Sequence, residues 1–375
     1  MNKTFYIFTF GCQMNKSDSE ILSGAMIADG YKKTDDAHSA GVLIFNTCAI
    51  RGNAENRAFS RLQEFNALRK KHKISQIIVV SGCVPQYEKE NFIEVYPYVD
   101  IVIGANSYEY LPEMLSEWHR NKKSAFKIID NKDAQSEAVA IDRETNDQAF
   151  MPITYGCNNF CSYCIVPYTR GREVSRTKDD IFSSIEKLAG TSYTKLLLLG
   201  QNVNSYGRGL YDEYRFADLL EDILSKFAWI ERIDFLTSHP KDITDKLIGV
   251  ISSNEKIGKE IHFPIQHGDD RILKLMNRGY SVADYKAKVK KLRASVKGVK
   301  ISTDLIVGFP GETEQEFQNM VEVVKEVGFY RSNTAAYSPR KGTGAASMEN
   351  QIDEVTKKRR LNELNKIVRE FGFKG

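Results

Sequence analysis

"TYGCNNFCSYCIVPYTRGREVSR", residues 154–176, places three of the chain's six cysteines within eight positions. They are Cys157, Cys161 and Cys164, with the spacing C-x3-C-x2-C. The stretch begins at the end of an apolar run, Met151–Tyr155, which we predict to be a β-strand. Three thiolates can ligate three irons of a four-iron four-sulfur cluster and leave the fourth iron open for a substrate or cofactor. The spacing therefore indicates a catalytic cluster at the carboxyl end of a strand.

A structural zinc ion is the alternative for these cysteines, because zinc in proteins is held by cysteine and histidine. It needs a fourth ligand, for which His239, His262 and His267 are the candidates. C-x3-C-x2-C is tighter than the usual spacing of zinc ligands, which favours the cluster.

Five more strand-like runs follow Met151–Tyr155, each separated from the next by a helix or a long loop. They are Lys195–Leu199, Arg232–Leu236, Ile261–Ile265, Lys300–Val307 and Asn333–Tyr337. Six such units fall short of the eight of a closed barrel. We therefore predict an open, partial (β/α)6 barrel with ligands at the carboxyl ends of its strands, and a final basic helix at about Asp353–Phe371.

The first 120 residues alternate apolar runs with helical stretches, which predicts a small parallel α/β domain. The runs are Phe5–Phe10, Val42–Phe45, Ile77–Val80 and Val99–Ile103, and the longest helical stretch is Asn53–Lys73. The fold class is thus α/β, with an N-terminal parallel domain and a partial barrel. We place the N-terminal domain at residues 1–120, a polar linker or edge hairpin at 121–150, and the barrel with its C-terminal helix at 151–375.

Composition limits the class of protein. The chain has 375 residues, 42% of them hydrophobic, and a formal net charge of only +4, so a polyanion would have to bind to local basic surface. No window approaches the 18 apolar residues of a membrane span, and we expect a cytoplasmic protein that makes no membrane contact. In that reducing compartment six cysteines indicate metal ligation or redox chemistry rather than disulfides.

The other three cysteines, Cys12, Cys48 and Cys83, each follow a predicted strand by two or three residues, in "FYIFTFGC", "VLIFNTC" and "IIVVSGC". Successive strands of a parallel sheet end at the same edge, so we expect these thiols to converge there. A lone free cysteine is often only a small buried hydrophobe. Three at equivalent places in three consecutive units predict a second three-thiolate site.

The cysteine loop, with Tyr163 just before its last cysteine, resembles the signature of radical S-adenosylmethionine enzymes. The segments "LLLLGQNVN" and "STDLIVGFPGETEQEF" resemble that superfamily's second-strand and fifth-strand motifs, in the correct order. The resemblance implies a four-iron cluster whose open iron chelates S-adenosylmethionine and whose reducing electron cleaves it to a 5′-deoxyadenosyl radical.

Two three-cysteine sites in one chain resemble the methylthiotransferases, which replace a C–H bond by C–S–CH3. Matching stretches run from "TFGCQMNKSDSE" through "NTCAIRGNAENR" and "SGCVPQ" to "YSPRKGTGAA". The resemblance implies two four-iron clusters, with the N-terminal one as sulfur donor, and cofactor binding near both the loop and the strand ends. The implied cofactor-binding residues are Tyr163, Gly200, Gln201, Asn202, Gln266, Arg278 and Asp304.

Within that family, "LGQNVNSYG" and "LMNRGY" look most like the enzymes that act on N6-dimethylallyladenosine beside the anticodon of tRNA. Methylthiolation of threonylcarbamoyladenosine or of a ribosomal-protein aspartate is the alternative, and "PIQHGDD", with His267 and Asp269, is closer to the ribosomal-protein branch. A small RNA-binding β-barrel usually follows in the family, and we expect this chain, which stops at "REFGFKG", to lack it.

Basic residues near the expected sites could bind the phosphates of a tRNA anticodon loop. Arg170, Arg172 and Arg176 follow the cysteines, although for Arg170 a buried ion pair is as good an interpretation. The stretch from Arg51 to Lys73 holds seven Lys or Arg against two acids. Asn202 and Arg172 are candidates to hold an adenine that has been splayed out of the loop.

The predicted reaction uses S-adenosylmethionine twice, as methyl donor to the sulfur held near Cys12, Cys48 and Cys83 and as radical source at Cys157, Cys161 and Cys164. It needs a flavodoxin-like or ferredoxin-like electron donor, and we expect a monomer. The alternative from a different class is a metal-stabilised RNA-binding module without catalysis, which would leave S-adenosylmethionine intact.

Overall fold

The computed structural model describes residues 3–50, 52–72, 75–130 and 140–372. The chain forms two compact units, of which the first comprises residues 1–157 and 165–187 and the second 158–164 and 188–375. The cysteine loop is thus divided between the units, because the chain enters the second unit at residue 158 and returns to the first at residue 165.

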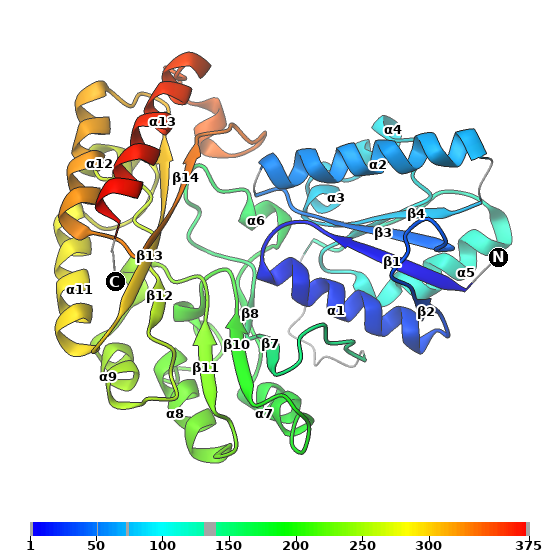
Figure 1. Ribbon diagram of the computed structural model, residues 1–375, viewed down its shortest axis with the longest axis horizontal. Coiled ribbons are helices and arrows are strands. Elements are labelled where there is room, and N and C mark those ends of the chain that lie inside the picture. Colours follow the sequence, from blue (N-terminus) through cyan, green and yellow to red (C-terminus); the bar gives the residue numbers. More distant parts are fainter. Residues whose placement is uncertain (1–2, 51, 73–74, 131–139, 373–375) are drawn as a thin grey trace. The chain divides into compact units, whose positions relative to one another are not determined.

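The first unit contains a six-stranded sheet in which every pairing is parallel (Figure 1). In sheet order its strands are β2 (Lys32–Lys33), β1 (Thr4–Thr9), β3 (Val42–Thr47), β4 (Ile77–Gly82), β5 (Ile101–Gly104) and β6 (Ala125–Lys127). The order 2-1-3-4-5 is one of the common doubly wound arrangements. It places the point where the chain changes direction along the sheet between β1 and β3.

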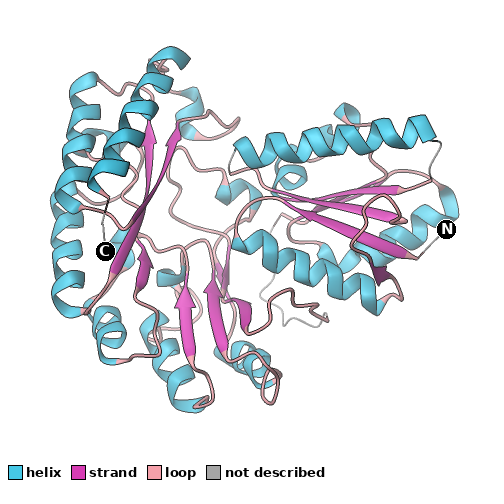
Figure 2. Ribbon diagram, viewed as in Figure 1, coloured by secondary structure: helices cyan, strands magenta, loops and turns pink. Residues whose placement is uncertain are grey.

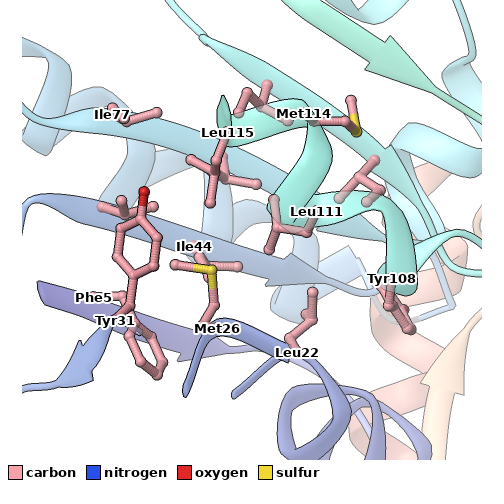
Figure 3. Close-up of a cluster of buried hydrophobic side chains, with 14 of the residues drawn as sticks. Phe5, Leu22, Met26, Tyr31, Ile44, Ile77, Tyr108, Leu111, Met114 and Leu115 are labelled. Carbon is pink, nitrogen blue, oxygen red and sulfur yellow. The ribbon is translucent and has the colours of Figure 1, made fainter. Parts of the chain in front are cut away.

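Helices cover both faces of this sheet because neighbouring strand residues point to opposite sides. Ile44 belongs to a buried cluster with side chains of α1 (Gln13–Ala28) and α5 (Leu111–Asn121), as Figure 3 shows. Phe45 belongs to a second cluster, on the other face, with side chains of α2 (Gly52–His72). Figure 2 shows the resulting helix–sheet–helix layers. Two short helices, α3 (Cys83–Glu88) and α4 (Asn91–Val95), complete the second face.

The N-terminal parallel α/β fold is confirmed, and the four strands that form its centre agree with the predicted runs to within three residues at each end. The structure adds β2 and β6, of which β6 lies in the stretch that we predicted to be a linker or an edge hairpin. It pairs parallel to β5 and is therefore the last strand of the sheet. Part of that stretch, 131–139, lies outside the described residues.

The second unit continues as parallel strands that alternate with helices. The strands are β10 (Lys195–Leu199), β11 (Arg232–Phe235), β12 (Glu260–His262), β13 (Lys300–Val307) and β14 (Arg331–Ala336). The main helices are α8 (Phe216–Lys226), α9 (Asp245–Ser253), α10 (Asp270–Leu275), α11 (Val282–Ser295), α12 (Glu314–Val327) and α13 (Glu354–Phe371). β10 pairs with β11, and β12, β13 and β14 pair in that order, all in parallel. Asp353 caps α13, whose end at Phe371 is where the sequence predicted it.

The strand predicted at Met151–Tyr155 is interrupted. β7 (Gln148–Pro152) ends before Ile153, and β8 (Thr154–Tyr155) pairs antiparallel with β9 (Val174–Ser175). α6 (Val166–Thr169) lies in the loop between β8 and β9, and α7 (Lys178–Glu186) follows β9. The cysteine loop therefore leaves and returns through a two-stranded ribbon.

In the described ranges we find no helix of the length and apolarity needed to cross a membrane.

Candidate functional site

The ends of β1, β3 and β4 bring the three N-terminal cysteines together. These strands are neighbours in the sheet, and Cys12, Cys48 and Cys83 follow their last residues by three, one and one positions. Gly11, at φ +125°, passes so close to Cys48 that a β-carbon on it would lie 2.6 Å from that of Cys48. The thiols of Cys12 and Cys83 are close enough to interact electrostatically. The predicted convergence at the carboxyl edge is present.

A buried amide network fixes these strand ends relative to one another. The Asn15 side chain accepts a hydrogen bond from the Cys12 backbone N–H at 3.3 Å and donates to Asn46 Oδ1 at 3.2 Å and to the Thr47 carbonyl at 3.1 Å. Thr47 in turn donates to the Ser81 carbonyl at 2.7 Å. The network spans the residues just before Cys48 and Cys83 and reaches the Cys12 sulfur, which donates to Asn15 Oδ1 at 3.4 Å, so hydrogen bonds fix the segments that carry the three thiols.

The surroundings of Cys83 suit an anionic ligand. Burial raises the pKa of the Cys83 thiol, and the guanidinium of Arg170 acts in the opposite direction by stabilising the thiolate. Cys12 is the N-cap of α1, whose positive end favours negative charge. Three thiols beside a cation and a helix N-terminus fit a cluster ligated by three thiolates.

The zinc alternative is not supported for either triad. The described ranges contain no group of three or more His, Cys, Asp or Glu side chains arranged to hold one metal ion. Thiolates that ligate separate irons of one cluster are spaced more widely than the ligands of a single ion, so this result does not count against a cluster.

The three histidines proposed as zinc ligands have other partners or other surroundings. Burial and the nearby Arg278 lower the pKa of His239 to about 2, so the ring is neutral. His262 hydrogen-bonds Ser302 and Asp304, each at 3.1 Å. His267 is fully buried, with Nε2 3.5 Å from Glu312 Oε2.

The base of the barrel cysteine loop is closed tightly within the first unit. The Cys157 N–H donates to the Gly171 carbonyl at 3.2 Å, and Gly156, at φ +70°, passes so close to Arg172 that a β-carbon would lie 2.0 Å from its carbonyl oxygen. Only glycine fits there, since a side chain would meet both strain and backbone.

In the second unit Arg278 binds the tip of the loop. This buried guanidinium donates through Nη1 to Cys161 Sγ and to the Tyr163 hydroxyl, each at 3.3 Å. It also donates to Tyr280 Oη at 2.8 Å and to the Pro264 carbonyl at 2.9 Å. Predicted site residues Tyr163 and Arg278 therefore lie together at Cys161.

Two further segments hold the same tip. Ser162 bonds the carbonyls of Met276 and Leu275, at 3.1 and 2.8 Å, and accepts from the Ala345 N–H at 2.7 Å. The side chain of Asn277 donates to the Phe160 carbonyl at 3.1 Å. These contacts explain why "LMNRGY" and "YSPRKGTGAA" accompany the cysteines in the sequence.

The segments after β10 and β11 carry buried polar atoms that have no hydrogen-bond partner among the described residues. Asn202 is committed to the fold, because it donates to Asp242 at 2.7 Å and accepts from the His239 N–H at 3.2 Å. By contrast, Gln201 Oε1, Asn204 Nδ2 and His239 Nε2 are buried and lack a hydrogen-bond partner among the described residues. Buried polar atoms of this kind are normally satisfied, so the region beside Gly200 fits a polar ligand such as the amino and carboxyl groups of S-adenosylmethionine.

Gln266 and Asp304 lie on neighbouring segments. Gln266 has a φ of +74° and pairs through its backbone with β13, donating to the Asp304 carbonyl at 3.0 Å. The Asp304 carboxylate contacts His262 and accepts from Asn333 Nδ2 at 2.9 Å. It is part of a polar network across β12, β13 and β14.

The three arginines predicted to bind RNA differ in exposure. Arg170 is 4% exposed and pairs with Asp18, and Arg176 is fully buried and donates to the Pro152 carbonyl and to Ser184 Oγ at 3.0 and 2.7 Å. Neither guanidinium can reach a phosphate from these positions, so the buried ion pair is the correct interpretation of Arg170. Arg172 is exposed.

The predicted basic stretch is α2, and its cations are also of two kinds. Arg57, Arg61, Lys70 and Lys71 are exposed, whereas Arg69 binds Asp100 at 2.6 Å and the Tyr98 carbonyl at 2.6 Å. Arg69 therefore fastens the helix to the sheet. Arg51 and Lys73 lie outside the described residues.

Several residues around the sites were not among the predicted site residues. Asp18, Tyr108 and Asn15 lie beside the N-terminal cysteines, and Tyr280 lies beside Arg278. The only available signal was that "CQMNKSDSE" is a helix whose polar residues Asn15, Asp18 and Ser19 lie at core-facing spacing.

Two family descriptions match the chain: "Uncharacterized protein family UPF0004" over residues 4–104 and "Radical SAM superfamily" over residues 151–324. Among curated proteins, a tRNA-2-methylthio-N(6)-dimethylallyladenosine synthase of Clostridium novyi is 46% identical over 99% of this chain and 82% of its own length. A protein of the same name from Caldicellulosiruptor saccharolyticus is 44% identical over 100% of this chain and 79% of its own length.

Solved structures show the same fold at low identity. The radical S-adenosylmethionine methyltransferase TsrM from Kitasatospora setae has a TM-score of 0.64 at 13% identity, over 92% of this chain and 74% of its own. The cobalamin-dependent S-adenosylmethionine radical enzyme OxsB has a TM-score of 0.54 at 11% identity, over 98% of this chain and 56% of its own. The expected architecture, a parallel α/β domain with a radical-enzyme barrel, is confirmed by these matches.

Proposed function

The chain belongs to the radical SAM superfamily and, within it, to the family of tRNA-2-methylthio-N(6)-dimethylallyladenosine synthases, and on this premise we propose that it methylthiolates N6-dimethylallyladenosine in tRNA. The observation that carries the proposal is the identity of 44–46% over essentially the whole chain. The enzyme is a transferase that replaces the hydrogen on carbon 2 of the adenine by a methylthio group.

Two four-iron clusters and S-adenosylmethionine are the cofactors of this reaction. Cys157, Cys161 and Cys164 would hold one cluster, and Cys12, Cys48 and Cys83 the other. When bound, the first supplies the electron that cleaves S-adenosylmethionine, and the second carries the sulfur that is methylated and transferred. We assign residues 1–120 to the second cluster and 151–375 to the radical chemistry, except that residues 151–157 and 165–187 pack with the first unit.

The chain's own residues orient these groups. Arg278, fixed by Pro264 and Tyr280, donates to Cys161 Sγ and keeps the loop tip in one conformation. Tyr163 and the unpartnered groups at Gln201, Asn204 and His239 supply polar contacts for S-adenosylmethionine. Gly200, Gln266 and Asp304 remain proposed cofactor positions, with Asn202 in the supporting role that its two hydrogen bonds give it.

The proposed partner is a tRNA anticodon loop, contacted through exposed cations such as Arg172 and those of α2. A flavodoxin-like or ferredoxin-like protein would supply the electrons, and we propose a monomer in the cytoplasm. "PIQHGDD" is no direct sign of a ribosomal-protein acceptor, because His267 is fully buried, with Nε2 3.5 Å from Glu312 Oε2.

Mass spectrometry after incubation with both kinds of acceptor tests the proposal. We expect 2-methylthio-N6-dimethylallyladenosine in tRNA and no change in ribosomal protein or in threonylcarbamoyladenosine. Modification of either of the latter in place of dimethylallyladenosine would refute the substrate, and intact S-adenosylmethionine under reducing, anaerobic conditions would favour the non-catalytic module.

The division of labour between the cysteines has its own test. Cys48→Ala should still cleave S-adenosylmethionine to 5′-deoxyadenosine but should no longer form methylthiolated tRNA or methylate an acid-labile sulfur. Cys161→Ala should lose 5′-deoxyadenosine and keep the methylation of that sulfur. Iron should amount to about eight per chain after anaerobic reconstitution and about half that when Cys157, Cys161 and Cys164 are all alanine. Methylthiolated tRNA from Cys48→Ala would overturn the mechanism.

A further inference from the structure

A buried ion pair lies beneath Cys83. Arg170 donates through Nη1 and Nη2 to the two carboxylate oxygens of Asp18, at 3.2 and 2.5 Å, and both side chains are only 4% exposed. Tyr108, 2% exposed, lies against the same pair. The two charges come from residues 152 positions apart, on α1 and at the end of α6.

Stability alone does not account for this pair. Taking two charges out of water costs several kcal/mol per ion, and apolar residues of the same volume are often as stabilising or more so. Apolar residues pack nearby, among them Val84 and Ile165, in the cluster that also contains Cys83. The pair therefore calls for an explanation in the function of the site that it adjoins.

The geometry of the Arg170 guanidinium explains why a buried ion pair would be useful here. Arginine has five N–H donors in a fixed fork, and the bidentate bond to Asp18 orients that fork while leaving donors free to point elsewhere. Arg170 ends α6, which packs against α3, the helix that begins with Cys83. The guanidinium is close enough to stabilise the Cys83 thiolate electrostatically. The carboxylate thus holds the arginine near the start of α3.

We propose that Arg170 is a positioning residue of the Cys12, Cys48 and Cys83 site, oriented by Asp18 so that it donates N–H bonds to the Cys83 sulfur and places one positive charge beside the group bound there. The inference rests on the proposed function, since it supposes that these cysteines hold a cluster. Hydrogen bonds to cluster sulfurs and nearby charge are among the factors that set a cluster's reduction potential. Arg170 follows the barrel cysteines in the sequence but would then act at the site of the N-terminal cysteines.

The test uses the full chain with Cys157, Cys161 and Cys164 replaced by alanine, so that only the N-terminal triad can hold iron. Into this parent we would introduce Arg170→Lys, Asp18→Asn, and the pair Arg170→Met with Asp18→Asn. The double change removes both charges and so avoids an unpaired buried ion. Arg176→Lys is the matched control, because it alters an equally buried arginine that contacts no cysteine in the bonds described above.

Iron per chain and the midpoint potential of the remaining cluster, followed by electron paramagnetic resonance, are the readouts. In the double variant the midpoint potential should become more negative, or at least half of the iron should be lost. In Asp18→Asn the midpoint potential should become more positive. Arg176→Lys should change neither the potential nor the iron. Near-UV circular dichroism verifies that each variant is folded. A double variant with the potential and iron of its parent would overturn the inference.

Two further outcomes separate the inference from its premise. A parent without any cluster would refute the proposed function and, with it, the inference. In the chain with all six cysteines, the double variant should bind tRNA with an unchanged dependence on salt. If the slope of the logarithm of the tRNA binding constant against the logarithm of salt concentration fell in magnitude by about one, Arg170 would contact a phosphate. That result would refute its assignment to Cys83.

Discussion

Replacing Glu20 by glutamine should stabilise the first unit at high pH and have no effect at low pH. Glu20 lies on α1 with 1% of its surface exposed. Its Oε1 accepts from the Glu144 N–H at 3.1 Å, and Arg143 is its nearest cation, with Nη1 3.7 Å from Oε2. Burial, only partly offset by the Glu144 N–H and Arg143, raises the pKa of this carboxyl from 4.5 to about 7.

The direction follows from linkage between protonation and folding. A carboxyl whose pKa is higher in the folded state than in the unfolded state favours folding while it is protonated. That advantage is complete below pH 4.5, declines as the pH rises to about 7, and is absent above it. Each tenfold change in proton affinity corresponds to about 1.4 kcal/mol, so the penalty on the charged form is at most about 3 kcal/mol. A neutral glutamine can still accept the hydrogen bond from the Glu144 N–H, and it does not have the penalty of a buried charge.

Urea unfolding at pH 5, 6, 7 and 8 measures the effect. The chain has two tryptophans, and Trp118 lies in the core of the first unit, so Trp229→Phe leaves a fluorescent reporter of that unit. The difference in unfolding free energy between Glu20→Gln and its parent should grow from less than about 1 kcal/mol at pH 5 to at most about 3 kcal/mol at pH 8.

Glu144→Gln is the matched control, since it neutralises an exposed carboxylate that pairs with Lys33 in the same segment. It should change stability by less than about 1 kcal/mol at every pH. A Glu20→Gln difference that did not vary with pH, or that became destabilising at pH 8, would refute the assignment of a buried, protonation-linked carboxyl.

Three further predictions concern packing and charge. Gly24→Ala should destabilise the first unit although alanine favours helices by about 1 kcal/mol, because its β-carbon would lie 1.7 Å from the Ala140 carbonyl; faster proteolysis near residues 140–144 would be the sign, and equal or greater stability would contradict it. Arg360→Met should cost about 3–5 kcal/mol by leaving the fully buried Glu312 without its guanidinium partner. Adding Glu312→Gln should recover much of the loss in urea unfolding, and an additive double variant would argue against the pair. The His239 ring should show no protonation between pH 4 and 9 by nuclear magnetic resonance, since its pKa is lowered to about 2, and the stability that the neutral ring contributes should decline only as the pH falls below 6.5; a transition near pH 6 would contradict this burial.

Much of the fold could be predicted because hydrophobic runs mark buried parallel strands. β10 and β13 begin and end at the predicted residues. β2 and β6 could not be found, because two or three residues with exposed or half-buried side chains carry no such pattern. The predicted strand at Met151–Tyr155 was too simple, since it is interrupted at Ile153 and its second part, β8, pairs antiparallel with β9. Pairing partners are not visible in local sequence.

The convergence of Cys12, Cys48 and Cys83 was predictable for a general reason, namely that parallel strands end at one edge. Which individual cations are buried and which are exposed could not be predicted. Arg170, Arg172 and Arg176 look alike in sequence, but only the packing of α6 and β9 decides that two are buried and one is exposed. Asp18 was missed because a single acid in a polar helix start gives no sign that its counter-ion comes from more than 150 residues later.

The late arrival of Arg170 has a consequence for biosynthesis. A ribosome releases β1 to β6 before residue 170, so for part of translation the nascent sheet exists while the Asp18 carboxylate has not yet met the Arg170 guanidinium. A lone buried charge of that kind disfavours the closed state by several kcal/mol. The nascent N-terminal unit should therefore pack fully around its cysteines only after residues 165–187 have joined it. Until then, during translation, iron and sulfide can still reach the cysteines.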